Sequence, residues 1–230
     1  MSRSGMGKSL GALFSESFRL LLEKPLIVVP SLLPFLWLLV ISIIGPGVIL
    51  TLFYTKTSFY GATYVTPSFI GVLAGYALFT LIFFALYMIA EGMTVVLVRQ
   101  AYDESRTDLG EALSVTMGRI GHLLLATLIV VVLVTIGELL LVIPGLIMMF
   151  LFWFVPQAVM LDDGGGLSAI GQSYRFFREN VGDAFVLILV SIVLYSLLGL
   201  LSWIPVIGAI LMLAGMPILS TWGTLLYLER

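Results

Sequence analysis

The chain has 230 residues, of which 60% are hydrophobic and only 10% are charged, and its formal net charge is −2. Soluble domains carry roughly 25% charged residues, so this chain has too little polar surface to cover a water-soluble globule. The small net charge gives no support for a nucleic-acid partner, and the absence of cysteine excludes disulfides, thiolate metal sites and cysteine nucleophiles. The composition predicts an integral membrane protein.

Six apolar stretches follow one another along the chain, and each approaches the ~20 residues that a helix needs to cross a bilayer. They cover residues 25–54, 68–98, 120–142, 145–161, 184–202 and 206–227. The sequence therefore predicts an all-α integral membrane protein with six transmembrane helices in a single polytopic domain, residues 1–230.

Three shorter segments with apolar side chains at helical spacing precede the first, third and fifth stretches. Their stripes are Leu10, Leu13, Phe14, Phe18 and Leu21; Leu109, Ala112, Leu113, Thr116, Met117 and Ile120; and Leu167, Ile170, Tyr174 and Phe177. Ser9 is placed to cap the first segment, and Asp108 with Glu111 resembles a capping box for the second. Each segment is predicted to be a short amphipathic helix at the membrane interface, here called an elbow, that leads into a span.

An elbow followed by an outgoing and a returning span recurs over residues 8–98, 107–161 and 166–228. Pro144 and Pro156 of the second unit match Pro205 and Pro217 of the third. The first proline of each pair is predicted to begin its helix, and the second to kink it where a neighbouring group satisfies the freed carbonyl. The pattern predicts a pseudo-threefold internal repeat.

The basic residues are distributed unevenly between the two sides of this topology. Of the eleven lysines and arginines, only Lys56 falls on the outer side, in the polar connection 55–67. Because cytoplasmic segments carry the excess of basic residues, both termini are predicted to be cytoplasmic and the protein to lie in the cell membrane.

Glu91 and Glu138 lie at membrane depth, where a carboxylate is expensive and function is the default hypothesis. Glu138 stands about one turn from the outer end of its span, so an interfacial carboxylate that reaches solvent is the favoured interpretation. For Glu91, a functional role and a structural pairing with a basic residue of an elbow stay open. His122, the one histidine, begins the third span and is favoured as a hydrogen-bonding anchor rather than a metal ligand.

The segment GMGKS at Gly5–Ser9 echoes the end of a phosphate-binding loop. Ser2 stands where that loop needs a glycine, and no strand can precede it, so no nucleotide is expected. No catalytic constellation, metal site or cofactor site is visible in the sequence, which therefore predicts a non-enzymatic protein.

Two long segments resemble the membrane domain attached to some glycerophosphoryl diester phosphodiesterases. They are AEGMTVVLVRQAYDESRTDLGEALSVTMGRIGHLL at residues 90–124 and IPGLIMMFLFWFVPQAVMLDDGGGLSAIGQSYRFFRENVGDAF at residues 143–185. The resemblance implies a six-span membrane domain like that of the family's stand-alone relatives. The hydrolase activity of that family belongs to a separate soluble domain, so the resemblance carries no catalytic residue.

Two functions are predicted. The first is to organise lipid, or to dock a partner, at the cytoplasmic leaflet, with membrane lipids as partners and a protein partner or a second copy left open. Arg19, Arg119, Arg175 and Arg178 are the candidates for contact with lipid headgroups, because each basic residue near an anionic leaflet adds roughly 1 kcal/mol of attraction. The alternative is a small transporter or pore that uses Glu91 and Glu138.

Overall fold

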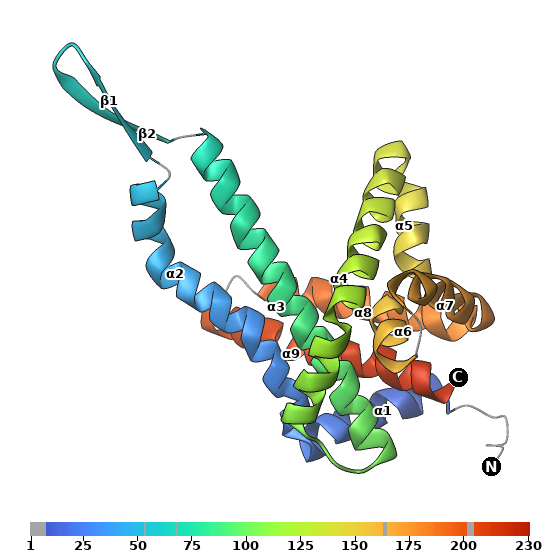
Figure 1. Ribbon diagram of the computed structural model, residues 1–230. Helices are drawn as coiled ribbons and strands as arrows, with labels where there is room; N and C mark the ends of the chain where they lie inside the picture. The colour runs from blue at the N-terminus through green and yellow to red at the C-terminus, as the bar shows by residue number, and fades with distance from the viewer. Residues whose placement is uncertain (1–7, 53, 68, 163–164, 202–204) are drawn as a thin grey trace. The chain divides into compact units, whose positions relative to one another are not determined.

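The computed structural model describes residues 8–52, 54–67, 69–162, 165–201 and 205–230 (Figure 1). This part of the chain is helical except for one two-stranded hairpin. In chain order the elements are α1 (Leu10–Glu23), the 3₁₀ helix η1 (Pro25–Ser31), α2 (Leu32–Leu52), β1 (Tyr54–Phe59), β2 (Ala62–Pro67), α3 (Phe69–Asp103), α4 (Leu109–Leu140), α5 (Val142–Leu151), α6 (Val155–Leu161), α7 (Gly166–Glu179), α8 (Val181–Leu201) and α9 (Pro205–Glu229).

Five helical stretches are long and apolar enough to cross a membrane, as in a multi-pass membrane protein. They are Pro25–Ile43, Ile70–Asp103, Leu109–Leu140, Val142–Leu161 and Val181–Leu201. The sixth predicted span falls within α9, and the side chains of its first turns lie outside those that the structure describes.

One side of α4 shows how such a helix meets lipid. Leu125, Leu128, Val132, Ile136 and Leu139 are exposed and recur every three or four residues, so they form one stripe along the helix. A stripe of this length would be an aggregation hazard in water, whereas it suits contact with acyl chains.

The chain forms two compact units, Met1–Ser31 together with Met88–Arg230, and Leu32–Tyr87. In the second unit β1 and β2 pair antiparallel, with Phe59 opposite Ala62, so that Tyr60 and Gly61 form a two-residue turn. Both turn residues have positive φ, 51° and 78°, as a type I′ hairpin turn requires. The connection 55–67, whose sequence is polar and aromatic, is therefore a β-hairpin.

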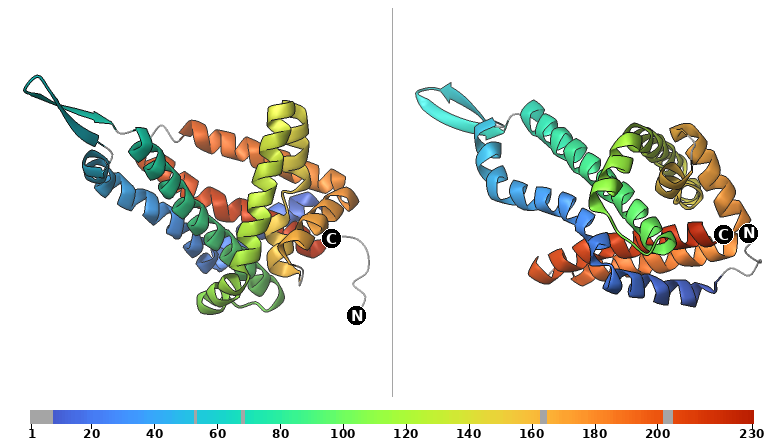
Figure 2. Two further views of the ribbon diagram at one scale, coloured as in Figure 1. Left: turned by 45° about the horizontal axis from the view of Figure 1, so that its top comes forward. Right: turned by 60° about the horizontal axis from the view of Figure 1, so that its bottom comes forward.

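In the first unit, α9 supplies the centre of the core. From Met216 to Leu226 its side chains are buried, with Ile218 half-buried. Helices α1 and α8 lie beside it (Figure 2). Trp222 of α9 meets the ring of Phe14 on α1 at 4.7 Å between centroids, which packs α1 onto the core.

Two of the three predicted elbows are separate helices, and one is not. The first is the separate helix α1, and the predicted cap is confirmed because the Ser9 hydroxyl accepts from the amide of Ala12 at 3.4 Å. The third is the separate helix α7. The second is not a separate helix, because residues 109–120 continue into α4 with no proline or cap to stop them.

The predicted capping box of α4 is half formed. The Asp108 carboxylate accepts from the amide of Glu111 at 3.0 Å. The amide of Asp108 donates to the side chain of Gln100 at 2.9 Å, and the Glu111 carboxylate instead pairs with Arg106 at 2.7 Å. The residue at N3 therefore stabilises the preceding loop rather than the cap.

The matched prolines also behave differently. Before Pro156 the helix is interrupted at residues 152–154, which separates α5 from α6. The hydroxyl of Ser173 on α7 donates to the carbonyl of Leu151 at 3.0 Å, whereas the carbonyl of Phe152, which Pro156 frees, accepts from the backbone amide of Val155 at 3.3 Å. Pro217, in contrast, lies inside the uninterrupted helix α9.

Candidate functional site

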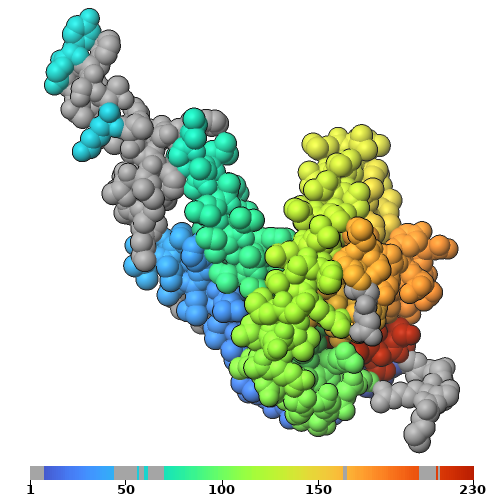
Figure 3. Space-filling view, in the orientation of Figure 1, coloured from blue at the N-terminus to red at the C-terminus, as the bar shows by residue number. Residues whose placement is uncertain are grey.

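Helix α7 presents both basic and apolar side chains on its exposed side. Its opposite face, with Ala169, Ser173 and Phe176, is buried, and α7 lies against α4, α5 and α6. On the exposed side the Arg178 guanidinium lies over the ring of Tyr174, 5.6 Å from its centroid, and Arg175 is exposed one residue after Tyr174. Figure 3 shows α4, α5 and α7 as neighbouring parts of one surface.

The exposed side of α7 continues into apolar surface. Leu167 is exposed at the start of α7, and Val181 and Phe185 are exposed at the start of α8. An exposed basic residue flanked by exposed apolar and aromatic groups is typical of a helix that lies at a membrane interface. We call Leu167, Tyr174, Arg175 and Arg178 the α7 surface.

Arg19 lies on a second surface of this kind. It is exposed on α1, where it is 3.8 Å from the carboxylate of Glu16 and 3.9 Å from that of Glu23. Phe18 and Leu22 are exposed beside it. The two carboxylates on its own helix offset its charge, so Arg19 attracts an anion less strongly than the arginines of α7 do.

Arg119 has a different environment from the other candidate arginines. It is half-buried, and its Nη1 donates to the carbonyls of Val159 at 2.9 Å, Met160 at 3.4 Å and Asp162 at 2.5 Å. These are carbonyls at the end of α6, which have no partners within that helix. Arg119 therefore caps α6 from α4.

The end of α6 is also tied to the central helix. The hydroxyl of Tyr227 on α9 donates to the Asp162 carboxylate at 2.6 Å, and the Tyr227 ring lies 4.6 Å from that of Phe176 on α7. Asp162 thus joins three helices, and its hydrogen bonds are those of a structural residue.

His122 lies where α7 begins. It is exposed on α4, and a Cβ added to Gly166 would stand 2.7 Å from the His122 carbonyl oxygen. The crossing of α4 and α7 therefore requires a residue without a side chain at 166, and the anchoring point at His122 is its backbone.

Glu138 and Glu91 occupy separate places. Glu138 is exposed near the end of α4, where a Cβ on Gly145 of α5 would approach its backbone nitrogen to 2.7 Å. Gly92, the residue after Glu91 on α3, packs against Thr116 and Leu123 of α4, the helix that carries Glu138. Leu123 and Glu138 are fifteen residues apart, which is about 22 Å along a helix. The two carboxylates therefore do not share a site.

Glu91 itself is buried, with 8% of its surface exposed. The hydroxyl of Ser220 on α9 lies within electrostatic reach of its carboxylate, although the two make no hydrogen bond of standard geometry. The ion pairs formed among the described residues do not include Glu91, so the expected partnership with a basic residue of an elbow is not found there.

A cluster of charged side chains that was not among the candidate sites surrounds Lys8. Its Nζ lies 2.7 Å from the carboxylate of Glu16 on α1 and 2.8 Å from that of Glu229 at the end of α9. The hydroxyl of Tyr102, on α3, also donates to Glu229. Partial burial by itself lowers the pKa of Lys8, but hydrogen bonds and charge from the two carboxylates raise it above its ordinary value.

The two ends of the described chain meet at this cluster. Arg230 donates to the carboxylate of Asp183, at the start of α8, at 2.6 Å and to the backbone carbonyl of Lys8 at 3.1 Å. Lys8 and Arg230 therefore lie at the same end of the first unit. The signal in the sequence was the concentration of charge at both ends, without any indication of which charges would pair.

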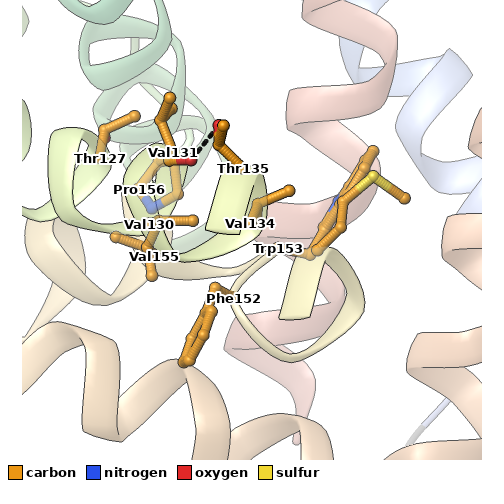
Figure 4. A pocket seen from close by; sticks show the side chains of 10 residues that line it. Thr127, Val130, Val131, Val134, Thr135, Phe152, Trp153, Val155 and Pro156 are labelled. Atoms are coloured by element: carbon orange, nitrogen blue, oxygen red, sulfur yellow. Dashed lines mark hydrogen bonds between the residues drawn. The ribbon is translucent and has the colours of Figure 1, made fainter. Parts of the chain in front are cut away.

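A groove with a volume of about 310 Å³ follows α4 (Figure 4). Its lining consists of Thr127, Val130, Val131, Val134 and Thr135 from α4, and Met149, Phe152, Trp153, Val155 and Pro156 from the interrupted helix opposite. The lining is almost entirely apolar and contains neither Glu91 nor Glu138. The residues that line this groove include no acidic, basic or imidazole side chain for acid–base chemistry.

Among the described residues, no three histidine, cysteine or acidic side chains gather to hold a metal ion. Residues 9–222 match the family described as Domain of unknown function (DUF7847). No curated protein and no solved structure matches the chain. The family description states no activity, and the resemblance to the phosphodiesterase-associated membrane domain stays a prediction. Because the match covers most of its length, the chain belongs to the DUF7847 family.

Proposed function

We propose that this protein is a non-enzymatic, six-span membrane protein that binds anionic lipid headgroups at the cytoplasmic leaflet through the α7 surface. The observation that carries the proposal is the exposure of Arg175 and Arg178 beside exposed apolar side chains on a helix whose opposite face is buried. Two exposed cationic side chains at an interface attract anionic lipid by roughly 2 kcal/mol, about 1 kcal/mol each.

The contacts of the termini support an even number of spans. Arg230 reaches the backbone of Lys8, so the chain enters and leaves the first unit at the same end. Six spans with both termini in the cytoplasm, built as three units that each pair an elbow with a helical hairpin, satisfy this constraint. The excess of basic residues assigns that end to the cytoplasm.

The hydrogen bonds of Arg119 reduce the number of arginines that can contact a lipid headgroup. Because its guanidinium caps α6, it is not available to a phosphate in the way that Arg175 and Arg178 are. The proposed headgroup site is therefore the α7 surface, with Arg19 on α1 as a second and weaker contact. A docked protein partner or a second copy of the chain would compete for the same α7 surface.

The transporter alternative has less support. A carrier that uses Glu91 and Glu138 together needs them in one pathway, and their levels along α4 differ by about 22 Å. The groove beside α4 contains neither of them.

The proposal is tested by native mass spectrometry of the full chain released from bilayers that contain phosphatidylcholine and phosphatidylglycerol. The double variant Arg175→Ala, Arg178→Ala is expected to retain roughly 30-fold less phosphatidylglycerol than the wild type, the equivalent of about 2 kcal/mol. The matched control is Arg99→Ala, Arg106→Ala, which removes the same charge from exposed arginines that pair with Asp103, Glu104 and Glu111. Equal retention by the wild type and the α7 variant would refute the proposal.

A further inference from the structure

The core of the first unit contains polar side chains that have no partner. Glu91 is 8% exposed, and Ser220 and Gln157 are 4% and 3% exposed. Among the described residues, the Ser220 hydroxyl, the Gln157 side-chain oxygen and the buried hydroxyl of Thr224 make no hydrogen bond of standard geometry. Buried polar atoms of this kind are costly unless something else satisfies them.

Ser220 and Thr224 differ from several other buried hydroxyls among the described residues, and they share the lack of a hydrogen bond with Thr116 and Thr127 of α4. Ser17, Thr94, Ser191 and Thr221 each donate to the carbonyl four residues earlier, at 2.6–2.8 Å. This is the usual way for a helix to satisfy a buried serine or threonine. Ser220 and Thr224 lie in the same kind of helix but have no such bond, so their oxygens are left for another ligand.

These side chains come from three helices, and Glu91 of α3 and Gln157 of α6 lie beside α9 near Ser220 and near Gly223, respectively. Ser220 and Thr224 are four residues apart, so they lie on one face of α9. The Glu91 carboxylate of α3 lies within electrostatic reach of Ser220. The Gln157 amide of α6 lies at the next turn, where a Cβ on Gly223 would stand 3.1 Å from its Nε2. We call Glu91, Gln157, Ser220 and Thr224 the Glu91 cluster.

The chemistry of this cluster is that of a small cation site. Carboxylate, hydroxyl and amide oxygens are hard ligands of the type that alkali and alkaline-earth cations prefer. One carboxylate balances one positive charge, whereas a divalent ion would leave a buried excess charge. We propose that the Glu91 cluster binds one monovalent alkali cation, which joins α3, α6 and α9. This site is separate from the α7 surface, so either proposal can fail without the other.

The first test is thermal unfolding of the full chain in detergent at constant pH and ionic strength, with choline chloride replaced stepwise by NaCl or KCl. At cation concentrations above the dissociation constant, each tenfold rise in the concentration of free cation is expected to raise the ratio of folded to unfolded protein up to tenfold. The Glu91→Gln variant keeps the shape of the side chain and loses the charge, so its unfolding temperature is expected to be the same in choline and in the alkali salts.

The matched control is Ser191→Ala, which removes a buried hydroxyl that is satisfied within α8 by the carbonyl of Leu187 at 2.8 Å. It is expected to lower the unfolding temperature equally in every salt and to keep the cation response. A wild type that responds to neither Na⁺ nor K⁺ would overturn the proposal and indicate a carboxyl that is permanently protonated. A response that survives in Glu91→Gln would overturn it as well.

The second test measures binding directly, by calorimetric titration of the cation that stabilises the wild type. One cation per chain is expected, with an affinity at least fivefold weaker in Ser220→Ala and unchanged in Ser191→Ala. Ser220→Ala removes only one oxygen and keeps the carboxylate, so this comparison holds even if Glu91→Gln fails to fold. Equal affinities in the two serine variants would place the cation elsewhere.

Discussion

Replacing Arg119 with methionine is expected to destabilise the first unit without reducing lipid retention. The guanidinium donates to three carbonyls at the end of α6, two of them at 2.9 Å and 2.5 Å. Hydrogen bonds to a charged group contribute about 1.5–3 kcal/mol. Because Arg119 is half-buried, solvent screening places the expected loss near the lower end of that range, at about 2 kcal/mol. For a chain of this length the loss corresponds to roughly 4–8 °C in Tm.

The assay is thermal unfolding of the purified chain in detergent, followed by native mass spectrometry of the same samples. Methionine keeps most of the apolar stem, so the loss reports on the charged donor. The control is Arg99→Met, whose guanidinium is exposed and 3.7 Å from the carboxylate of Asp103 on the same helix. A pair of this type contributes about 0.3–0.5 kcal/mol. An Arg119→Met variant with the wild-type Tm and a reduced content of anionic lipid would refute the assignment of Arg119 as a cap.

Three further predictions concern single contacts. Gly166→Ala is expected to destabilise by about 1–3 kcal/mol, because its Cβ would stand 2.7 Å from the carbonyl oxygen of His122, whereas Gly171→Ala on the same helix has open space and should be neutral or stabilising; denaturant titration of both variants compares them. Ser173→Ala should lower stability by about 1 kcal/mol in the same titration, because the carbonyl at the end of α5 loses its donor, and an unchanged midpoint would contradict this. The pKa of Lys8 is raised in the folded state, so its pairing with two carboxylates stabilises the protein below the ordinary lysine pKa and is lost as the pH rises through the folded pKa. The Lys8→Met variant should therefore unfold more easily at neutral pH and show a shallower loss of Tm at alkaline pH. Parallel profiles of Tm against pH for the variant and the wild type would argue against the pairing.

Features that depend on neighbours in the sequence could be predicted, and those that depend on distant partners could not. The helical spacing of apolar residues places α1 and α7, and Ser9 caps α1 because its partner, the amide of Ala12, is three residues away. The extent of α4 is harder to predict, because a helix break near residue 120 would require a stop signal that the sequence does not contain. The hairpin at residues 54–67 is hard to predict from the sequence, because its turn is Tyr60-Gly61 rather than the Asn-Gly or Asp-Gly pair that is typical of type I′ turns.

The four arginines illustrate the same limit at the candidate site. By sequence, Arg119 and Arg175 are both basic residues on interfacial helices, and nothing local separates them. The structure separates them because the partners of Arg119 are carbonyls 40 to 43 residues away, whereas Arg175 stays exposed. A headgroup candidate predicted from charge alone therefore becomes a cap as soon as an open helix end lies within its reach.

Pro156 and Pro217, which the predicted repeat matches, lie in different local geometries. Pro156 is in the first turn of α6, where its missing N–H costs no helical hydrogen bond, whereas Pro217 lies inside α9 and removes one. The packing around the two prolines differs as well. Next to Pro156, Phe154 is fully buried against Phe176, with ring centroids 4.8 Å apart, and a hydroxyl from α7 satisfies the end of α5.

Pro217 lies inside a helix that continues through it. Thr221 donates back to the Pro217 carbonyl at 2.6 Å. Ser220 and Thr224 both follow Pro217 and are four residues apart, so the continuous helix places them on one face, which the Glu91 cluster requires. The packing around each proline, rather than the proline itself, therefore decides whether the helix is interrupted.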